Sequence, residues 1–93
     1  RPEDLAVLRQ LTDDIYQDFT SRLNSRFTNL TDVDIQLCIL IKLGFSISQI
    51  AILTAISPTS VSQQKSRTKK RIQQQEPDCF AEGETLDLWL RKF

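Results

Sequence analysis

The densest group of ionisable side chains in the sequence is entirely basic. Five bases fall within seven residues, and they are Lys65, Arg67, Lys69, Lys70 and Arg71. Such a run attracts phosphate when it lies on one surface of a protein. An isolated charge run can equally be a solvated helix face that acids elsewhere balance. The remaining charges and the local helix pattern help to decide between these two interpretations.

The charges of the chain are segregated by sign. The 93 residues contain 12 Lys and Arg and 12 Asp and Glu, so the net charge is zero. Residues 1–34 hold seven acids and four bases (−3), residues 35–75 six bases and no acid (+6), and residues 76–93 five acids and two bases (−3). The one-signed middle segment favours a polyanionic partner. We expect four acids of the last segment to weaken non-specific binding, and they are Glu76, Asp78, Glu82 and Glu84.

The composition offers little for catalysis or metal binding. The chain has no His, which removes the commonest general base and metal ligand. Cys38 and Cys79 do not have a zinc-binding spacing, and we interpret both as small apolar core residues in a reducing compartment. Asp32 and Asp34 suit a helix start better than a catalytic pair. We therefore predict that the chain is not an enzyme and holds no cofactor and no metal.

The pattern of apolar residues predicts helices and leaves little room for strands. Apolar residues recur at three- and four-residue steps near the start of the chain, and they are Leu5, Leu8, Leu11, Ile15, Phe19, Leu23 and Phe27. This stripe predicts one long amphipathic helix from residue 3 to about residue 26. We expect it to connect to further parts of a longer protein, because the chain begins without Met.

Four side chains suited to N-cap positions predict four further helix starts, and they are Thr31, Ser46, Ser57 and Thr85. Asp34 and Gln49 complete capping boxes with the first two caps. Gly44 supplies a left-handed stop before the second cap, and Pro58 fits the first position of the third helix. The last helix, 86–92, has an apolar face that we expect to pack back on the core.

The predicted helix over 47–54 and the next one, which is 57–74 when its N-cap is included, are joined by the three residues Ala55, Ile56 and Ser57, which fits a helix-turn-helix. In the first of them, Ile50, Ala51 and Leu53 are predicted to face inward. The second has a thin apolar face, and its members are Val61, Thr68 and Ile72. Its other faces carry short polar side chains and bases suited to base edges and phosphates. These candidate DNA-binding residues are Thr59, Ser62, Gln63, Lys65, Ser66, Arg67, Lys69 and Lys70.

The segment from Leu30 to Ile72 resembles the C-terminal helix-turn-helix domain of the LuxR/FixJ/GerE regulators. The matching residues run in register without gaps, and they are Leu30, Thr31, Asp34, Leu43, Gly44, Ser46, Gln49, Ile50, Ala51, Leu53, Ile56, Ser57, Ser60, Val61, Arg71 and Ile72. The resemblance implies a four-helix unit whose third helix enters the major groove of DNA. It places Ser62, Gln63 and Ser66 at base-contacting positions. Family members often have His where Gln64 stands.

The resemblance also implies that four residues lie at or beside phosphate-contacting positions, and they are Lys65, Arg67, Lys69 and Lys70. The sequence thus predicts an all-α chain with three parts: an amphipathic connecting helix (1–28), a helix-turn-helix DNA-binding domain (29–75), and an acidic loop with a C-terminal helix (76–93). In place of the fourth helix that the family uses for dimerisation, the sequence has this acidic last part.

The predicted function is sequence-specific DNA binding by the C-terminal effector domain of a bacterial transcriptional regulator. We expect a cytoplasmic location, with or without a membrane anchor elsewhere in the parent protein. The expected partners are double-stranded DNA, an upstream sensor region and, as an open question, a second copy in a homodimer, without a small-molecule cofactor. Two alternatives stay open: a helical protein-interaction module that uses the stripe over 5–27, and a sigma-factor-like promoter-recognition domain.

Overall fold

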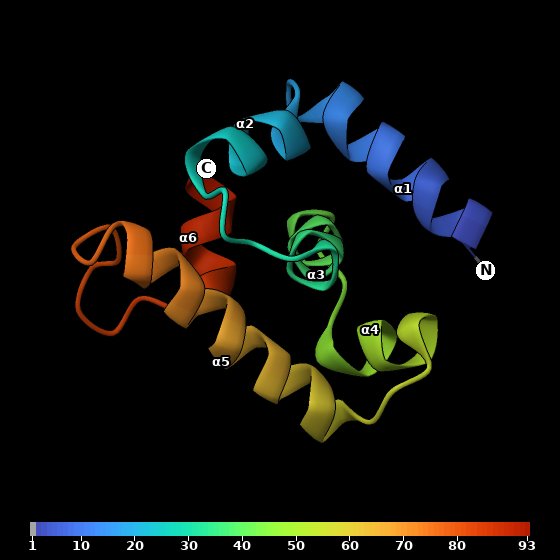
Figure 1. Ribbon diagram of the computed structural model, residues 1–93. Helices are drawn as coiled ribbons and strands as arrows, with labels where there is room; N and C mark the ends of the chain where they lie inside the picture. Colours follow the sequence, from blue (N-terminus) through green and yellow to red (C-terminus); the bar gives the residue numbers. More distant parts are fainter. Residues whose placement is uncertain (1) are drawn as a thin grey trace.

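The computed structural model describes residues 2–93, and this part of the chain forms six α-helices without strands. They are α1 (Pro2–Ile15), α2 (Phe19–Arg26), α3 (Asp32–Lys42), α4 (Ile47–Thr54), α5 (Pro58–Gln75) and α6 (Leu86–Lys92). In Figure 1 α3 is seen end-on at the centre, with α1 and α2 on one side of it and α4 and α5 on the other. The predicted all-α class is confirmed for the described residues.

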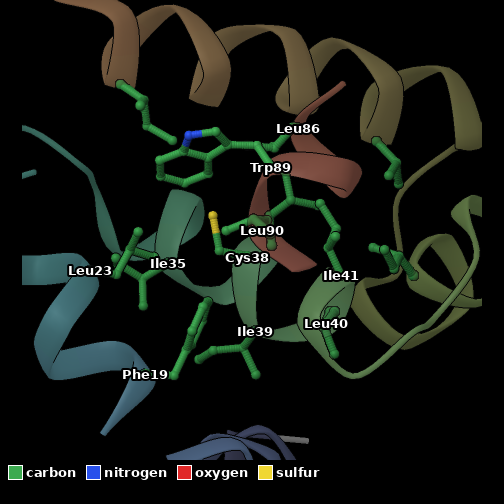
Figure 2. Packing of buried hydrophobic residues seen from close by; sticks show 14 of the residues in the cluster. Phe19, Leu23, Ile35, Cys38, Ile39, Leu40, Ile41, Leu86, Trp89 and Leu90 are labelled. Atoms are coloured by element: carbon green, nitrogen blue, oxygen red, sulfur yellow. The ribbon is translucent and has the colours of Figure 1, made fainter. Parts of the chain in front are cut away.

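The core is built around α3, which is apolar on nearly every side. Six of its buried side chains are Ile35, Leu37, Cys38, Ile39, Leu40 and Ile41. Figure 2 shows Cys38 of this helix between Phe19 of α2 and Trp89 of α6, and all six belong to one cluster of buried apolar residues. A helix that is apolar all round must be covered by its neighbours, and here α1, α2, α5 and α6 all contact it.

The C-terminal helix packs back on the core, as the sequence predicts. Trp89 and Leu90 are buried, and the Trp89 ring lies 5.6 Å from the Phe27 ring, centroid to centroid. The indole N–H donates to the Cys79 carbonyl at 3.1 Å, so the polar atom of this ring is also satisfied. Lys42 Nζ donates to the Leu90 carbonyl at 2.7 Å, which ties the end of α3 to the end of α6.

The predicted single helix over residues 3–26 is wrong, because the chain breaks between α1 and α2. Gln17 and Asp18 have φ angles of 49° and 57°, which lie in the left-handed region. The Asp13 carboxylate accepts hydrogen bonds from the Thr20 backbone N–H at 2.8 Å and from the Thr20 hydroxyl at 2.6 Å. The first of these bonds satisfies a backbone N–H that would bond to a carbonyl in a continuous helix.

The break divides the apolar stripe into two parts. Phe19, Leu23 and Phe27 are fully buried, whereas Leu11 is 45% exposed and Ile15 is 55% exposed. The break lets α1 and α2 lie against different parts of α3. The regular spacing of apolar residues in the sequence therefore does not produce one continuous apolar face in the structure.

The predicted caps at the other four helices are all confirmed. Each N-cap hydroxyl accepts from the backbone N–H three residues later, and these caps are Thr31, Ser46, Ser57 and Thr85. Both predicted capping boxes are complete. Gly44 has a φ of 92°, as expected for the left-handed end of a helix. One predicted inward residue, Leu53, is instead 42% exposed, because α4 buries only Ile50 and Ala51.

Candidate nucleic-acid interface

The candidate interface begins at the corner between α4 and α5. Three residues join the two helices, and the first of them, Ala55, has a φ of 58°. The Ile56 N–H donates to the Ala51 carbonyl at 3.1 Å, which closes the end of α4. The Ser57 hydroxyl then accepts from the Ser60 N–H at 3.1 Å and starts α5. This tight corner places the two helices in contact.

Helix α5 has one buried side. Its buried residues are Val61, Thr68 and Ile72, which are the three that the helical wheel assigns to the inward face. With few apolar residues, α5 is fixed to the scaffold along a narrow line. Half-buried residues flank this line, and the side of the helix opposite to it is exposed to solvent.

Six of the eight candidate DNA-binding residues lie on the exposed surface of α5. They are Thr59, Ser62, Gln63, Ser66, Arg67 and Lys70. Their spacing of three and four residues places them along one side of the helix. We call these six residues the exposed strip. Its first half carries hydroxyl and amide groups, and its second half carries two cations.

The other two candidates, Lys65 and Lys69, turn toward the C-terminal segment. The Lys65 side chain is only 18% exposed, and its Nζ lies 3.0 and 3.1 Å from the two carboxylate oxygens of Asp87. Lys69 Nζ donates to the Glu84 carbonyl at 2.5 Å and lies 4.9 Å from the centroid of the Phe80 ring. Both amines therefore have partners within the protein.

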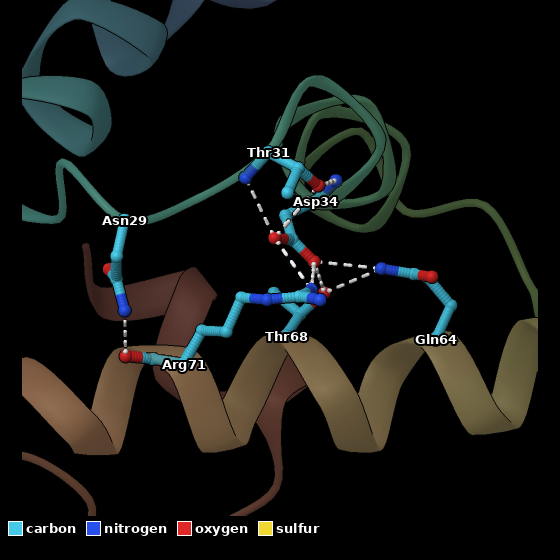
Figure 3. Close-up of polar contacts among 6 residues, drawn as sticks. All are labelled: Asn29, Thr31, Asp34, Gln64, Thr68 and Arg71. Atoms are coloured by element: carbon cyan, nitrogen blue, oxygen red, sulfur yellow. Dashed lines mark hydrogen bonds and ion pairs between the residues drawn. The ribbon is translucent and has the colours of Figure 1, made fainter.

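A buried carboxylate connects α5 to the start of α3 (Figure 3). Asp34 is fully buried, and its Oδ1 accepts from Thr68 Oγ1 at 2.6 Å and from Gln64 Nε2 at 2.7 Å. Arg71 Nη1 donates to both carboxylate oxygens, at 2.8 and 2.9 Å. The Thr31 backbone N–H donates to Oδ2 at 2.8 Å. We call these five residues the Asp34 network.

The surroundings of Asp34 keep it ionised. Burial by itself raises the pKa of the carboxyl, but hydrogen bonds from Thr68 and Thr31 and the charge of Arg71 together hold its pKa below the ordinary value. Removal of either charge would leave the other incompletely paired at the junction of two helices. The Asp34 network therefore fixes the position of α5 on α3.

The sequence predictions included only part of this network. They assigned Asp34 to helix capping, which is correct, and counted Arg71 with the basic run. Arg71 instead pairs with Asp34 and takes no part in the exposed strip. The available signal was Thr68, a polar residue on the apolar face of α5, because a buried hydroxyl needs a hydrogen-bond partner.

Two observations bear on other kinds of site. Within residues 2–93, no three His, Cys, Asp or Glu side chains group as potential metal ligands. The described helices also include none with the length and apolar content needed to cross a bilayer.

Comparisons of the chain with protein-family models, with curated proteins and with solved structures find no match.

Proposed function

We propose that the chain binds double-stranded DNA sequence-specifically, with the exposed strip of α5 in the major groove. The observation that carries this proposal is the division of α5 into a narrow buried line and a polar exposed strip. A helix that enters a groove needs this division, since one side must stay on the scaffold while another reaches base edges. In this proposal α4 and the corner at Ala55 complete a helix-turn-helix.

The length and chemistry of α5 suit a groove. Its 18 residues span about 27 Å at the usual rise per residue. Ser62, Gln63 and Ser66 supply short donors and acceptors for base edges, and Gln can form a bidentate pair with adenine. Arg67 and Lys70 carry charge that suits the phosphates beside the groove. In this assignment the strip reads bases in its first half and binds phosphates in its second.

The Asp34 network supports the proposal through rigidity. Specific base contacts need side chains that are positioned before binding, because ordering a mobile helix would reduce the affinity. Asp34 and Arg71 hold the second half of α5 against α3, while Val61 packs its first half. The exposed strip is therefore presented by a helix that is anchored along its length.

The resemblance to LuxR/FixJ/GerE domains is consistent with this use of α5. We propose that the chain is the effector part of a LuxR-like bacterial transcription regulator, controlled by other parts of a longer protein. A sigma-factor-like promoter-recognition domain would use the same kind of corner. The two uses differ in the DNA that each selects, since a dimeric regulator prefers two-fold symmetric sites.

The alternative of a protein-interaction module through the stripe over 5–27 is less well supported. Phe19, Leu23 and Phe27 are fully buried in the core of the chain itself. A coiled-coil seam needs its apolar residues at the surface over several heptads. Only the part of the stripe on α1 remains exposed, as at Leu11 and Ile15.

The proposed function can be tested by selection of random duplexes on the purified chain, repeated at low and high salt. We expect one enriched motif whose affinity falls steeply as salt rises. A two-fold symmetric motif would indicate binding as a dimer. The absence of enrichment together with the absence of binding at low salt would contradict the proposal.

A further inference from the structure

The C-terminal segment lies against the basic part of α5. Figure 1 shows α6 beside α5, and the loop between them leads back along the helix. Asp87, in the first turn of α6, pairs with Lys65 through both carboxylate oxygens. The backbone just before α6 binds Lys69 through the Glu84 carbonyl. The segment therefore contacts two of the basic side chains, Lys65 and Lys69, that are predicted to bind phosphate.

These contacts divide the basic run of α5 into bound and free members. Arg71 pairs with Asp34, Lys65 pairs with Asp87, and Lys69 lies between a carbonyl and an aromatic ring. Arg67 and Lys70 are exposed to solvent. The charge that the folded chain offers to a phosphate backbone is therefore smaller than its sequence suggests.

Two of the four acids that are expected to weaken non-specific binding form ion pairs with residues outside α5. Glu76 pairs with Arg26 of α2 at 2.6 Å, and Glu84 pairs with Lys92 of α6. Neither of these ion pairs includes a candidate DNA-binding residue. Among the described ion pairs, the one that joins the C-terminal segment to a candidate DNA-binding residue is the pair of Asp87 with Lys65.

We propose that Asp87 competes with DNA phosphate for Lys65 and thereby lowers the non-specific affinity of the domain. This inference rests on the proposed function. A carboxylate that occupies a phosphate-binding amine must be displaced before that amine can release counterions from DNA. Non-specific binding depends almost entirely on phosphate contacts, whereas base contacts by Ser62, Gln63 and Ser66 are unaffected. Asp87 therefore increases the preference for the specific site.

The pair is suited to exchange. The Asp87 side chain is 39% exposed, so water and salt reach the carboxylate and weaken its attraction for Lys65. Lys65 has a flexible four-carbon stem, which lets its amine move between two nearby anions. By contrast, the carboxylate of Asp34, which pairs with Arg71, is fully buried.

The test compares Asp87→Asn with a matched control, Asp78→Asn. Both substitutions remove one negative charge from the C-terminal segment, but Asp78 is an exposed loop residue. Binding to a labelled duplex of random sequence is measured by fluorescence anisotropy over a range of salt concentrations. We expect Asp87→Asn to tighten binding about 3- to 10-fold near physiological salt and to steepen the salt slope by about 0.9, as for one added phosphate contact. Asp78→Asn should leave the slope unchanged.

Lys65→Gln provides a second variant and identifies the amine involved. In the Lys65→Gln background, Asp87→Asn should no longer tighten binding. Lys65→Gln alone should weaken non-specific binding less than Lys70→Gln, since Lys65 is already paired in the free protein. Circular dichroism on each variant checks that it is folded, and the comparison of Lys65→Gln with Lys70→Gln does not require the Asp87→Asn variant to fold.

The outcomes separate this inference from the proposed function. If the wild type binds DNA and Asp87→Asn behaves like Asp78→Asn, the inference is overturned and the proposed function stands. If Asp87→Asn binds the random duplex and the wild type does not, the competition is supported in its strongest form. If neither protein binds any duplex at low salt, both the inference and the proposed function are overturned.

Discussion

Arg71 Nη1 donates to both carboxylate oxygens of Asp34, at 2.8 and 2.9 Å, and so joins the second half of α5 to the first turn of α3. The Asp34 side chain is fully buried, and the Arg71 side chain is one-third exposed. Thr68 and Gln64 bind the same carboxylate, so the pair belongs to a network in which several polar groups satisfy one another. This relationship makes Arg71 a residue that positions α5, although it lies in the basic run.

Replacement of Asp34 by Ala should strongly destabilise the fold. It leaves Arg71, Thr68 and Gln64 without their shared acceptor, and loss of one partner of such a buried pair costs about 3–5 kcal/mol. The free energy of unfolding is measured by chemical denaturation. Asp32→Ala in the same helical turn is the control, because Asp32 is exposed and its loss should cost less than about 0.5 kcal/mol. Equal effects of the two changes would contradict the structural role of the network.

Acid should destabilise the protein through the same carboxylate. The pKa of Asp34 is lowered in the folded state, so the unfolded chain takes up a proton at this residue more readily. The stabilisation is therefore present above the ordinary aspartate pKa of about 3.9 and is lost as the pH falls through the lower folded value. Denaturation midpoints measured between neutral pH and pH 3 should show this decline. The decline should be smaller in Asp34→Asn, and an unchanged decline would assign it to other acids.

Gln63→Ala should weaken binding to the selected duplex while leaving random-sequence binding unchanged. Gln63 is exposed near the middle of the strip, and loss of a good base contact costs about 1–3 kcal/mol. Titration of both duplexes at one salt concentration measures the two affinities. Gln73→Ala, one of the half-buried residues near the end of α5, is the control. An equal loss on both duplexes would argue against base reading by Gln63.

Lys70→Ala should instead weaken binding to every duplex and flatten the salt slope by about 0.9, because an exposed amine lost from the strip removes one phosphate contact. Lys69→Ala is the comparison, since Lys69 Nζ is held by the Glu84 carbonyl and the Phe80 ring. We expect a smaller change in slope for Lys69→Ala. If the two variants have the same slope, the contacts of Lys69 do not restrict its use.

Local signals in the sequence predicted most of the fold. The four N-caps and Gly44 depend on bonds within a few residues, and all of them are present. The break between α1 and α2 could not be predicted this way. Its left-handed residues, Gln17 and Asp18, are not glycines. The Arg22 side chain, in the next helix, donates hydrogen bonds to the backbone carbonyls of Tyr16 and Gln17. The apolar spacing continues across the break and so conceals it.

For the candidate interface, the sequence predicted which side of α5 is buried but not the partners of its charged side chains. A helical wheel needs only the helix and its apolar residues, and it placed Val61, Thr68 and Ile72 inward. It could not show that Lys65 meets Asp87, because that contact depends on how the chain returns after α5. The pairing of Arg71 with Asp34, 37 positions away, is likewise set by the packing of α5 on α3.

The central claim is that the exposed strip of α5 contacts DNA, and backbone amide NMR with the selected duplex tests it most directly. A titration of the isotope-labelled chain reports which amides change their environment on binding. We predict that the largest shifts occur at Ser62, Gln63 and Ser66, with smaller ones at Arg67 and Lys70. Amides of α1 should change little. Shifts confined to α1, or none at saturating duplex, would contradict the account.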